Sequence, residues 1–316
     1  MDIKKTLIVC LSLLFFMQFF GQGLETQKKF ALPENITFED FIVVTKNQEH
    51  FNSFYHSSYL YFDLYIDTDE KDLYEMGYSL RFRKRIFNDS ITNYTFQLKD
   101  EMTLVKEIRM EIEEKELDFY NIKQNNKWIP LTHALDTIFN LYSKLSNKKD
   151  SISFHKNLSL IKEWIKVKSS GAIAPFQRLR YIDSLTFNDN KIKSFVPVLI
   201  GNSIRKRAHI YIDSTYTVNE KLKFNRRIKA NTPLFFQENL NFNWLFESSL
   251  DYSTFVYLKN NETIIIKEYE VENKFINPEK GRDLLKKYEK IMTGNLGMYI
   301  KYDSKYKQSI QYFNSN

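Results

Sequence analysis

Apolar and charged residues alternate with a period of two in several segments of the chain. Side chains two residues apart share one face of a β-strand, so each segment predicts a strand with an apolar and a charged face. The predicted strands are residues 78–85, 94–99, 106–113, 176–181, 204–213 and 264–274. Their charged positions are Arg81, Arg83 and Arg85; Arg109, Glu111 and Glu113; Arg178 and Arg180; Arg205, Arg207 and His209; and Glu268, Glu270 and Glu272.

Three other segments, residues 117–146, 158–167 and 278–292, repeat apolar residues at helical spacing. The third begins with Pro278 and Glu279, which suit the first turn of a helix. No linker or fixed repeat divides the later chain, which predicts one domain over residues 23–316, with residues 147–150 as the alternative boundary. The patterns together predict an α+β fold with helices against the apolar side of an antiparallel sheet.

A strand with one charged face is ordinarily part of a sheet that is half exposed to water. Here one segment carries arginine at every second position and another carries glutamate, and like charges so close repel unless a counter-charge or ligand lies between them. If the sheet closes with these faces inward, the arginines bind an anion and the glutamates bind a cation. A metal-complexed phosphate requires both.

The first 22 residues predict a signal peptide. A basic start at Lys4 and Lys5 precedes an apolar run over residues 6–20, which is shorter than the roughly 20 residues of a membrane span. Gly21 and Gly23 then form a small-x-small cleavage site, so the mature chain is expected to begin near Gly23 without a transmembrane helix. The expected location is exported, periplasmic or secreted. An uncleaved N-terminal anchor is the alternative.

Composition excludes several kinds of chemistry. Cys10 is the single cysteine and lies in the predicted signal peptide, so a mature chain has no thiol nucleophile, disulfide or cysteine zinc site. The sequence contains no GxGxxG, GxxxxGK[ST] or HExxH motif. The net charge of +7 suits an anionic partner, but no nucleic-acid-binding module is recognisable.

The first half of the chain resembles the CYTH, or triphosphate tunnel, superfamily. Residues 65–68 (YIDT) and 72–83 (DLYEMGYSLRFR) are similar to its YFDT-xxxxL-xxxG-xxLRxR stretch. Residues 94–99 resemble its LTLK strand, and residues 106–113 resemble its RxExE strand. The order and spacing agree over about fifty residues, which makes the resemblance more specific than any single motif.

The second half resembles the polyphosphate-polymerase branch of the same superfamily. Residues 197–213 are similar to its arginine-rich strand, and residues 267–272 look like the acidic EIE strand near the C-terminus. Residues 304–306 (SKY) resemble a terminal motif of that branch.

The resemblance implies an eight-stranded antiparallel closed barrel, forming a tunnel, with helices packed on its outside. It implies phosphate binding by basic residues of the matching strands and Mg²⁺ or Mn²⁺ binding by their glutamates. The candidate phosphate-binding residues are Arg81, Arg83, Lys99, Arg109, Arg178, Arg180, Arg205 and Arg207, and the candidate metal ligands are Glu111, Glu113, Glu270 and Glu272. No catalytic residue is assigned, because a lone histidine such as His209 on a strand is ordinarily structural.

One departure from the family concerns its first strand. Members that hydrolyse triphosphates begin with an ExExK strand, which supplies metal-binding glutamates and a phosphate-binding lysine. Residues 37–46 are taken as its counterpart, with Phe41 and Val43 following Glu39 at that spacing and Lys46 on the other face. The sequence therefore predicts an exported protein that binds, and on one hypothesis hydrolyses, triphosphate or polyphosphate with a divalent metal. The alternatives are a non-catalytic anion-binding protein and a structural exported protein whose charges form salt bridges.

Overall fold

The computed structural model describes residues 23–33, 35–37, 40, 52–87, 90–100, 108–115, 117–124, 126–144, 148–182, 187–211, 244–273 and 278–315. The predicted signal peptide, residues 1–22, lies outside these residues. Among them, no helix is both long enough and apolar enough to cross a membrane.

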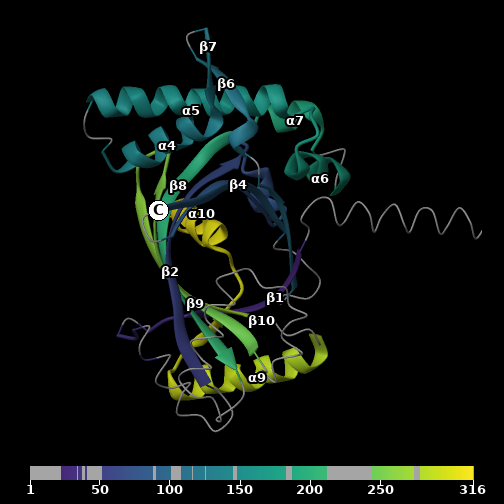
Figure 1. Ribbon diagram of the computed structural model, residues 1–316, viewed down its shortest axis with the longest axis vertical. Coiled ribbons are helices and arrows are strands. Elements are labelled where there is room, and N and C mark those ends of the chain that lie inside the picture. The colour runs from purple at the N-terminus through teal and green to yellow at the C-terminus, as the bar shows by residue number, and fades with distance from the viewer. Residues whose placement is uncertain are drawn as a thin grey trace, which may run out of the picture.

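A nine-stranded antiparallel sheet dominates the structure, with the strand order β10-β9-β8-β2-β3-β4-β5-β1-β11. A separate hairpin, β6 and β7, projects away from the sheet at the top of the view (Figure 1). The strands are β1 (Gly23–Ala31), β2 (Asn52–Asp67), β3 (Tyr78–Phe87), β4 (Ser90–Asp100), β5 (Ile108–Glu114), β6 (Asn121–Gln124), β7 (Lys127–Pro130), β8 (Val196–Tyr211), β9 (Trp244–Tyr257), β10 (Thr263–Asn273) and β11 (Tyr299–Lys301).

Strand β1 pairs with the two strands that end the main run of the sheet. Residues 23–26 pair with β5, and residues 27–31 pair with β10. Each of the strands β1, β2, β3, β4, β5, β8, β9 and β10 therefore has a paired neighbour on both sides. The large antiparallel sheet and the α+β class agree with the sequence prediction.

Helices lie at both ends of the sheet (Figure 1). The helices are α3 (Asp72–Glu75), α4 (Leu131–Leu141), α5 (Lys148–Lys168), α6 (Ala174–Ile182), α7 (Asp189–Lys193), α9 (Pro278–Asn295) and α10 (Lys305–Ser315). The helices predicted at residues 158–167 and 278–292 are present, and each is longer than its pattern indicates.

The largest core lies between the sheet and helices α4 to α7. Leu80 and Phe82 of β3 alternate with the arginines and are fully buried on this side. Phe82 stacks on Phe96 of β4 at 4.5 Å between ring centroids, and Trp164 of α5 meets both rings edge-on. Because this apolar face packs against the helices, the charged face of β3 points to the other side of the sheet, which is called its inner side below.

A second core lies between α9 and the strands β1, β8, β9 and β10. Leu285, Tyr288 and Met292 of α9 pack against a face that includes Ile210 and Tyr269. This face also alternates with charged positions, because Tyr269 lies between Glu268 and Glu270. The charged residues of β10 therefore point away from α9.

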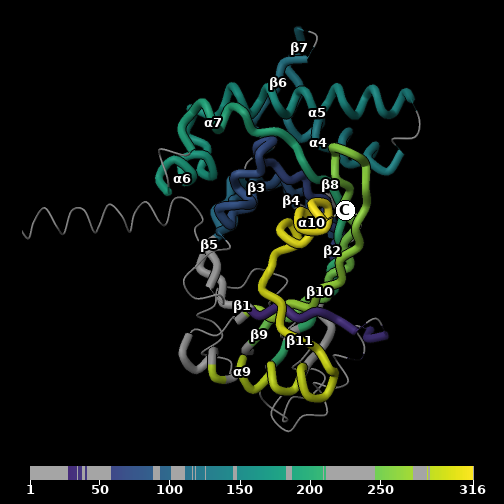
Figure 2. The backbone as a smooth tube through the Cα atoms, turned by 180° about the vertical axis from the view of Figure 1, so that it is seen from behind, coloured from purple at the N-terminus to yellow at the C-terminus, as the bar shows by residue number. Residues whose placement is uncertain are grey.

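Helix α10 forms a third core on the inner side of the sheet. Tyr306, Ile310 and Phe313 are buried against a cluster that includes Tyr65 of β2 and Phe255 of β9. The Tyr306 and Tyr65 rings stack at 5.0 Å between centroids. Figure 2 shows α10 between β3, β4 and β5 on one side and β2, β8 and β10 on the other. The expectation that every helix packs outside the sheet is wrong for α10.

Two predictions of secondary structure are wrong. Residues 176–181 form part of α6 and not a strand, because Pro175 suits the first turn and Phe176 and Leu179 bury one helical face. Residues 117–146 do not form one helix. Asn126, with a φ of 61°, makes the tight turn of the β6–β7 hairpin, and α4 begins after Pro130.

Candidate functional site

A cavity of about 490 Å³ lies on the inner side of the sheet. Its walls come from β1, β2, β3, β4, β5, β8, β9 and β10 and from the start of α10. The basic residues that line it are Lys29, Arg81, Arg83, Arg85, Lys99, Lys115, Arg205, Arg207 and Lys305. The acidic residues are Glu111, Glu113, Glu247, Glu268, Glu270 and Glu272. Nine of these lining residues are basic and six are acidic; with the buried Asp63 and Asp251, which pair with Arg83 and Arg205, the balance is nine to eight, a small positive excess.

Arg81 and Arg83 of β3 are held by buried partners on the neighbouring strands. Arg83 donates Nε and a terminal nitrogen to the two oxygens of Asp63, each at 2.7 Å. Arg81 donates to Gln97 and to the hydroxyl of Tyr65, and lies 3.6 Å from Asp63. Burial alone would raise the pKa of Asp63, but the two guanidinium groups outweigh it and hold the pKa at about 2.

The pair of hydrogen bonds from Arg83 to both oxygens of Asp63 is an arginine fork, and a second fork joins β8 and β9. Arg205 donates to both oxygens of Asp251 at 2.7 and 2.5 Å, and to Glu270 at 3.0 Å. Burial opposes ionisation of Asp251, yet Arg205 and then Lys305 hold its pKa well below the usual range. Tyr61 of β2 joins the two forks, because its ring lies 4.5 Å from the Arg83 guanidinium and 5.6 Å from that of Arg205.

Strand β4 contributes Lys99, and β5 contributes Glu111 and Glu113, whose pKa values shift in opposite directions. Lys99 and Glu111 are directly opposed in register, and their charged groups lie 2.6 Å apart. Burial disfavours the Glu111 carboxylate, but Lys99 and Arg81 hold its pKa well below normal. Burial and the neighbouring charge of Glu111 raise the pKa of Glu113.

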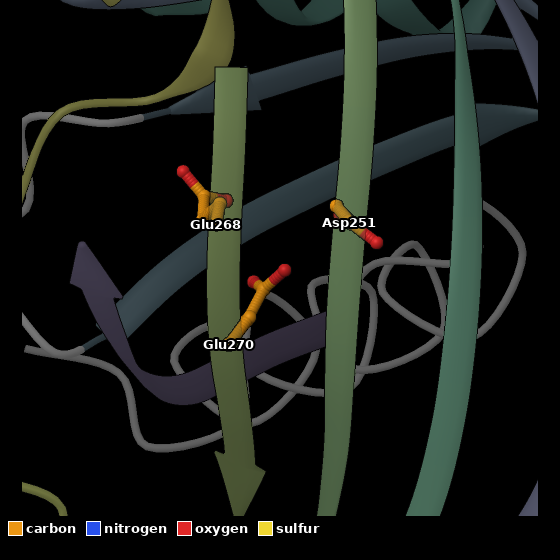
Figure 3. A group of neighbouring side chains, drawn as sticks. All are labelled: Asp251, Glu268 and Glu270. Carbon is orange, nitrogen blue, oxygen red and sulfur yellow. The ribbon is translucent and has the colours of Figure 1, made fainter. Parts of the chain in front are cut away.

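Three carboxylates from β9 and β10 form a compact acidic cluster. Asp251, Glu268 and Glu270 each offer an oxygen within 4.8 Å of the others, and Asp251 and Glu268 are fully buried. Figure 3 shows Asp251 on one strand and both glutamates on the neighbouring strand. Carboxylate oxygens are the ligands that Mg²⁺ and Mn²⁺ prefer, so this donor set fits a hard divalent cation. Of the predicted metal ligands, only Glu270 belongs to this cluster.

Basic residues of the protein also contact the acidic cluster. Lys29 Nζ lies 3.1 Å from Glu268 Oε1. Lys305 Nζ contacts Asp251 Oδ2 and lies 3.9 Å from Glu268 Oε1. Together with the Arg205 fork, these contacts place three cationic groups on three carboxylates.

Most of the residues predicted for the site line the same cavity. The basic residues are Arg81, Arg83, Lys99, Arg205 and Arg207, and the acidic residues are Glu111, Glu113, Glu270 and Glu272. Arg207 lies 3.3 Å from Glu247 at one side of the cavity. Arg109 and His209 lie on β5 and β8, and their side chains fall outside what the structure describes.

The structure does not bring Arg178 and Arg180 to the cavity. Both lie on α6, and neither is among the residues that line it. Arg180 donates to the carbonyl oxygens of Ser169 and Gly171, just after the end of α5. The guanidinium thereby holds the turn that follows α5. Assignment of these two arginines to phosphate binding is therefore not supported by their position.

Strand β1 lies between β5 and β10, in the place that the sequence analysis gave to residues 37–46; of those residues, 38–39 and 41–46 lie outside the described part of the chain. Positions 25, 27 and 29 alternate along β1, and they carry Glu25, Gln27 and Lys29. This spacing is that of the ExExK strand, with Gln27 in place of the second glutamate. The side chain of Lys29 lines the cavity, whereas those of Glu25 and Gln27 lie outside the described part of the chain. The alternation in residues 25–29 was a usable signal, but it lies directly beside the predicted cleavage site.

Other residues of the site were missed because their partners are distant in sequence. Asp251 lies in a strand whose serine-rich pattern gives no clear alternation. Lys305 belongs to the SKY segment at residues 304–306, but nothing in the sequence shows that α10 packs against the inner side of the sheet. Glu268 aligns with Glu270 and Glu272 on one strand face, so its position was predictable although its place in a cluster was not.

No family model and no curated protein matches the sequence. Solved structures match most of it at low similarity. A protein from Hippeastrum, assigned as an adenylyl cyclase and described as having a dominant triphosphatase activity, covers 90% of this chain and 95% of its own, with 13% identity and a TM-score of 0.39. A protein from Bacillus halodurans assigned as an adenylate cyclase covers 85% and 91%, with 15% identity and a TM-score of 0.36.

The RNA triphosphatase Pct1 of S. pombe covers 100% of this chain and 91% of its own, with 10% identity and a TM-score of 0.24. At such similarity, the function proposed below rests on the residues of this cavity.

Proposed function

We propose that this protein binds a triphosphate or short polyphosphate anion in the cavity, together with a divalent metal, and hydrolyses a phosphoric anhydride bond of that anion. The observation that carries the proposal is the convergence of basic and acidic residues from eight strands on one cavity. Bidentate guanidinium groups match phosphate oxygens and stay charged at any physiological pH. Clustered carboxylates supply the ligands of a hard cation.

The arrangement suits the charge changes of phosphoryl transfer. A water oxygen attacks a phosphorus atom, the bond from that phosphorus to the bridging oxygen breaks, and the water releases a proton, giving two shorter phosphates. Arg205, Arg207 and Lys99 line the cavity, and they would bind and orient the anion and stabilise its non-bridging oxygens. Asp251, Glu268 and Glu270 would hold the metal, which supplies charge neutralisation on the phosphate.

We further propose that the complete circuit of paired strands is a closed tunnel barrel. The support is the dual pairing of β1 with β5 and β10, which leaves no unpaired long edge among the described strands of the circuit. Helix α10 packs against the inner side of the sheet near Tyr65 and Phe255 and narrows the tunnel at that end. The anion would therefore enter from the opposite end, where Arg85 and Arg207 lie.

Calorimetry with tripolyphosphate, with and without Mg²⁺, tests binding, and phosphate release with Mg²⁺ or Mn²⁺ tests hydrolysis. We expect heat of binding in both conditions and release of phosphate that stops when the metal is chelated. No heat in either condition, from a protein shown to be folded, would leave a structural role in which the charges only pair across strands.

A second candidate is an anion-binding protein without turnover. Gln27 favours it, because an amide stands where the ExExK motif has a second carboxylate. The contacts of Lys29, Lys305 and Arg205 with the acidic cluster favour it too, because they neutralise that cluster without a metal. Binding of tripolyphosphate with no phosphate release would select this candidate.

Export remains a proposal, supported by the basic start, the short apolar run and the Gly21-x-Gly23 site. Fractionation of the native host and intact-mass analysis of the recovered protein would test it. Retention of residues 1–20 in a cytosolic fraction would contradict it.

A further inference from the structure

Lys305 places an ammonium group on the acidic cluster from the inner side of the sheet. It is the first residue of α10, it lines the cavity, and its side chain is 9% exposed. Its Nζ contacts Asp251 Oδ2 and lies 3.9 Å from Glu268 Oε1. The ammonium thus lies where two of the three clustered carboxylates face each other.

The cluster is electrically matched in this state. Arg205 pairs with Asp251 and Glu270, Lys29 lies on Glu268, and Lys305 lies on Asp251. A divalent cation added to this set would leave excess positive charge in a buried, low-dielectric place, which is costly. Entry of the cation therefore requires one of the basic groups to leave the carboxylates.

Lys305 is the group most readily displaced. Arg205 is held by a two-point fork on a central strand. The Lys29 ammonium contacts Glu268, whereas the Lys305 ammonium lies between Asp251 and Glu268, where a cation shared by these carboxylates would lie. Lys305 has a flexible four-carbon stem beside the open cavity. Helix α10 is anchored elsewhere, because Tyr306 donates to Asp67 at 2.7 Å and Phe313 stacks on Tyr257. The Lys305 side chain can turn while the helix stays in place.

We propose that Lys305 and a divalent cation exchange at the acidic cluster. Without ligand, the ammonium holds Asp251 and Glu268; when the cation enters with a phosphate anion, the ammonium turns toward the phosphate oxygens. Lys305 thereby sets the affinity of the cluster for metal and links metal binding to anion binding. This inference rests on the proposed function, because it uses the cluster as the metal site.

The first test is Mn²⁺ binding by the full mature chain without any anion, followed by electron paramagnetic resonance. Lys305→Met keeps most of the apolar stem and removes the charge, while Asp251 retains Arg205. We expect Lys305→Met to bind Mn²⁺ at least about tenfold more tightly, since the metal no longer has to break a charge-assisted contact. Lys307→Met on the same helix is the matched control, because Lys307 is 41% exposed and pairs with Asp303. Unchanged Mn²⁺ affinity in a folded Lys305→Met chain would overturn the exchange.

A second test uses the unmodified protein, so it does not depend on the variant folding. Amine labelling followed by mass spectrometry measures the reactivity of Lys305, with Lys307 as the internal reference. We expect saturating Mn²⁺ to raise Lys305 labelling and tripolyphosphate added with Mn²⁺ to lower it again. If Lys305 labelling does not change when Mn²⁺ binds, the exchange is wrong. If neither the unmodified protein nor Lys305→Met binds Mn²⁺, the exchange also fails. Heat of binding from metal-free tripolyphosphate would then still support the anion-binding part of the proposed function.

Discussion

The Arg83 guanidinium and the Asp63 carboxylate face each other across β3 and β2 in direct register, joined by two hydrogen bonds of 2.7 Å. Asp63 is 1% exposed, so the pair contributes to stability only while the carboxylate is ionised. Its folded-state pKa of about 2 is below the ordinary value of 3.8. The stabilisation is therefore fully present above about pH 4 and is lost as the pH falls toward 2.

Asp63→Asn should remove this part of the acid sensitivity. The shift of nearly two pKa units corresponds to about 2 kcal/mol of unfolding free energy. At pH 7 the variant should also be less stable by about 3–5 kcal/mol, because it leaves buried arginines without their counter-charge. Urea unfolding of both proteins between pH 7 and pH 2.5 is the measurement. Parallel pH curves for the two proteins would contradict the assigned pKa.

Arg207→Gln should weaken tripolyphosphate binding. Arg207 lines the cavity and contacts Glu247, which is partly accessible, so its loss exposes no fully buried charge. One charge-assisted hydrogen bond is worth about 1.5–3 kcal/mol, or about 10- to 150-fold in Kd. Calorimetry should show this loss, with Lys166→Gln on the outer face of α5 as the control for net charge. An equal loss in both variants would indicate a general effect of charge and not a site.

Glu270→Gln should separate metal binding from anion binding. It removes one carboxylate of the acidic cluster and one partner of Arg205, so metal-free tripolyphosphate should bind as well as before or more tightly. The increase in affinity caused by Mg²⁺, and any metal-dependent phosphate release, should disappear. Glu163→Gln, at an exposed position of α5, is the matched control. If the variant keeps its Mg²⁺ response, the metal does not use Glu270.

Gly201→Ala should destabilise the protein strongly, whereas Gly294→Ala should not. A Cβ at position 201 would lie 2.2 Å from the Thr254 carbonyl oxygen and 2.4 Å from the Phe255 ring, so β8 and β9 would have to separate. We expect a loss of at least about 1–3 kcal/mol. A Cβ at position 294, in α9, meets nothing within 4 Å, and alanine there should stabilise by about 0.5–1 kcal/mol. Thermal and urea unfolding of both variants would measure the difference.

The N-terminal part of β1 should be needed for the ligand site. Residues 23–26 make the pairing between β1 and β5, so a chain that begins at Gly23 keeps it and a chain that begins at Lys28 does not. The shorter chain should lose tripolyphosphate binding and unfold at lower urea concentration, although it retains Lys29. Equal binding by the two chains would show that the β1–β5 pairing does not shape the site. Signal-peptide cleavage well beyond Gly23 would likewise be incompatible with this role of β1.

Much of the sheet follows from local pattern. The alternation of Leu80 and Phe82 with the arginines around them predicted both a strand and its two faces, and β3 has both. The same holds for β10, where Glu268 and Glu270 flank Tyr269. Period-two patterning is reliable here because one face packs against helices, and a one-residue slip would move the charged side chains from the cavity into that apolar core.

The period-two pattern gave a wrong strand prediction at residues 176–181. Arg178 and Arg180 alternate as they would in a strand, but α6 buries Phe176 and Leu179 three residues apart. A short segment of this kind fits both periods, and packing against α5 and the sheet selects the helix. The beginning of β1 was missed for a different reason, because its alternation over residues 25–29 lies directly beside the predicted cleavage site and was not read as a strand.

The spacing of residue types along the chain was enough to show which residues are charged on one strand face, and therefore that Arg81, Arg83 and Glu270 would share an interior if the sheet enclosed one. Which of these residues meet depends on the three-dimensional arrangement of the strands. Asp251 reaches Arg205 across 46 positions and Lys305 across 54, through strand register and the docking of α10. Local patterning cannot carry such pairings, because they depend on the order in which strands pair and on which side of the sheet the last helix packs.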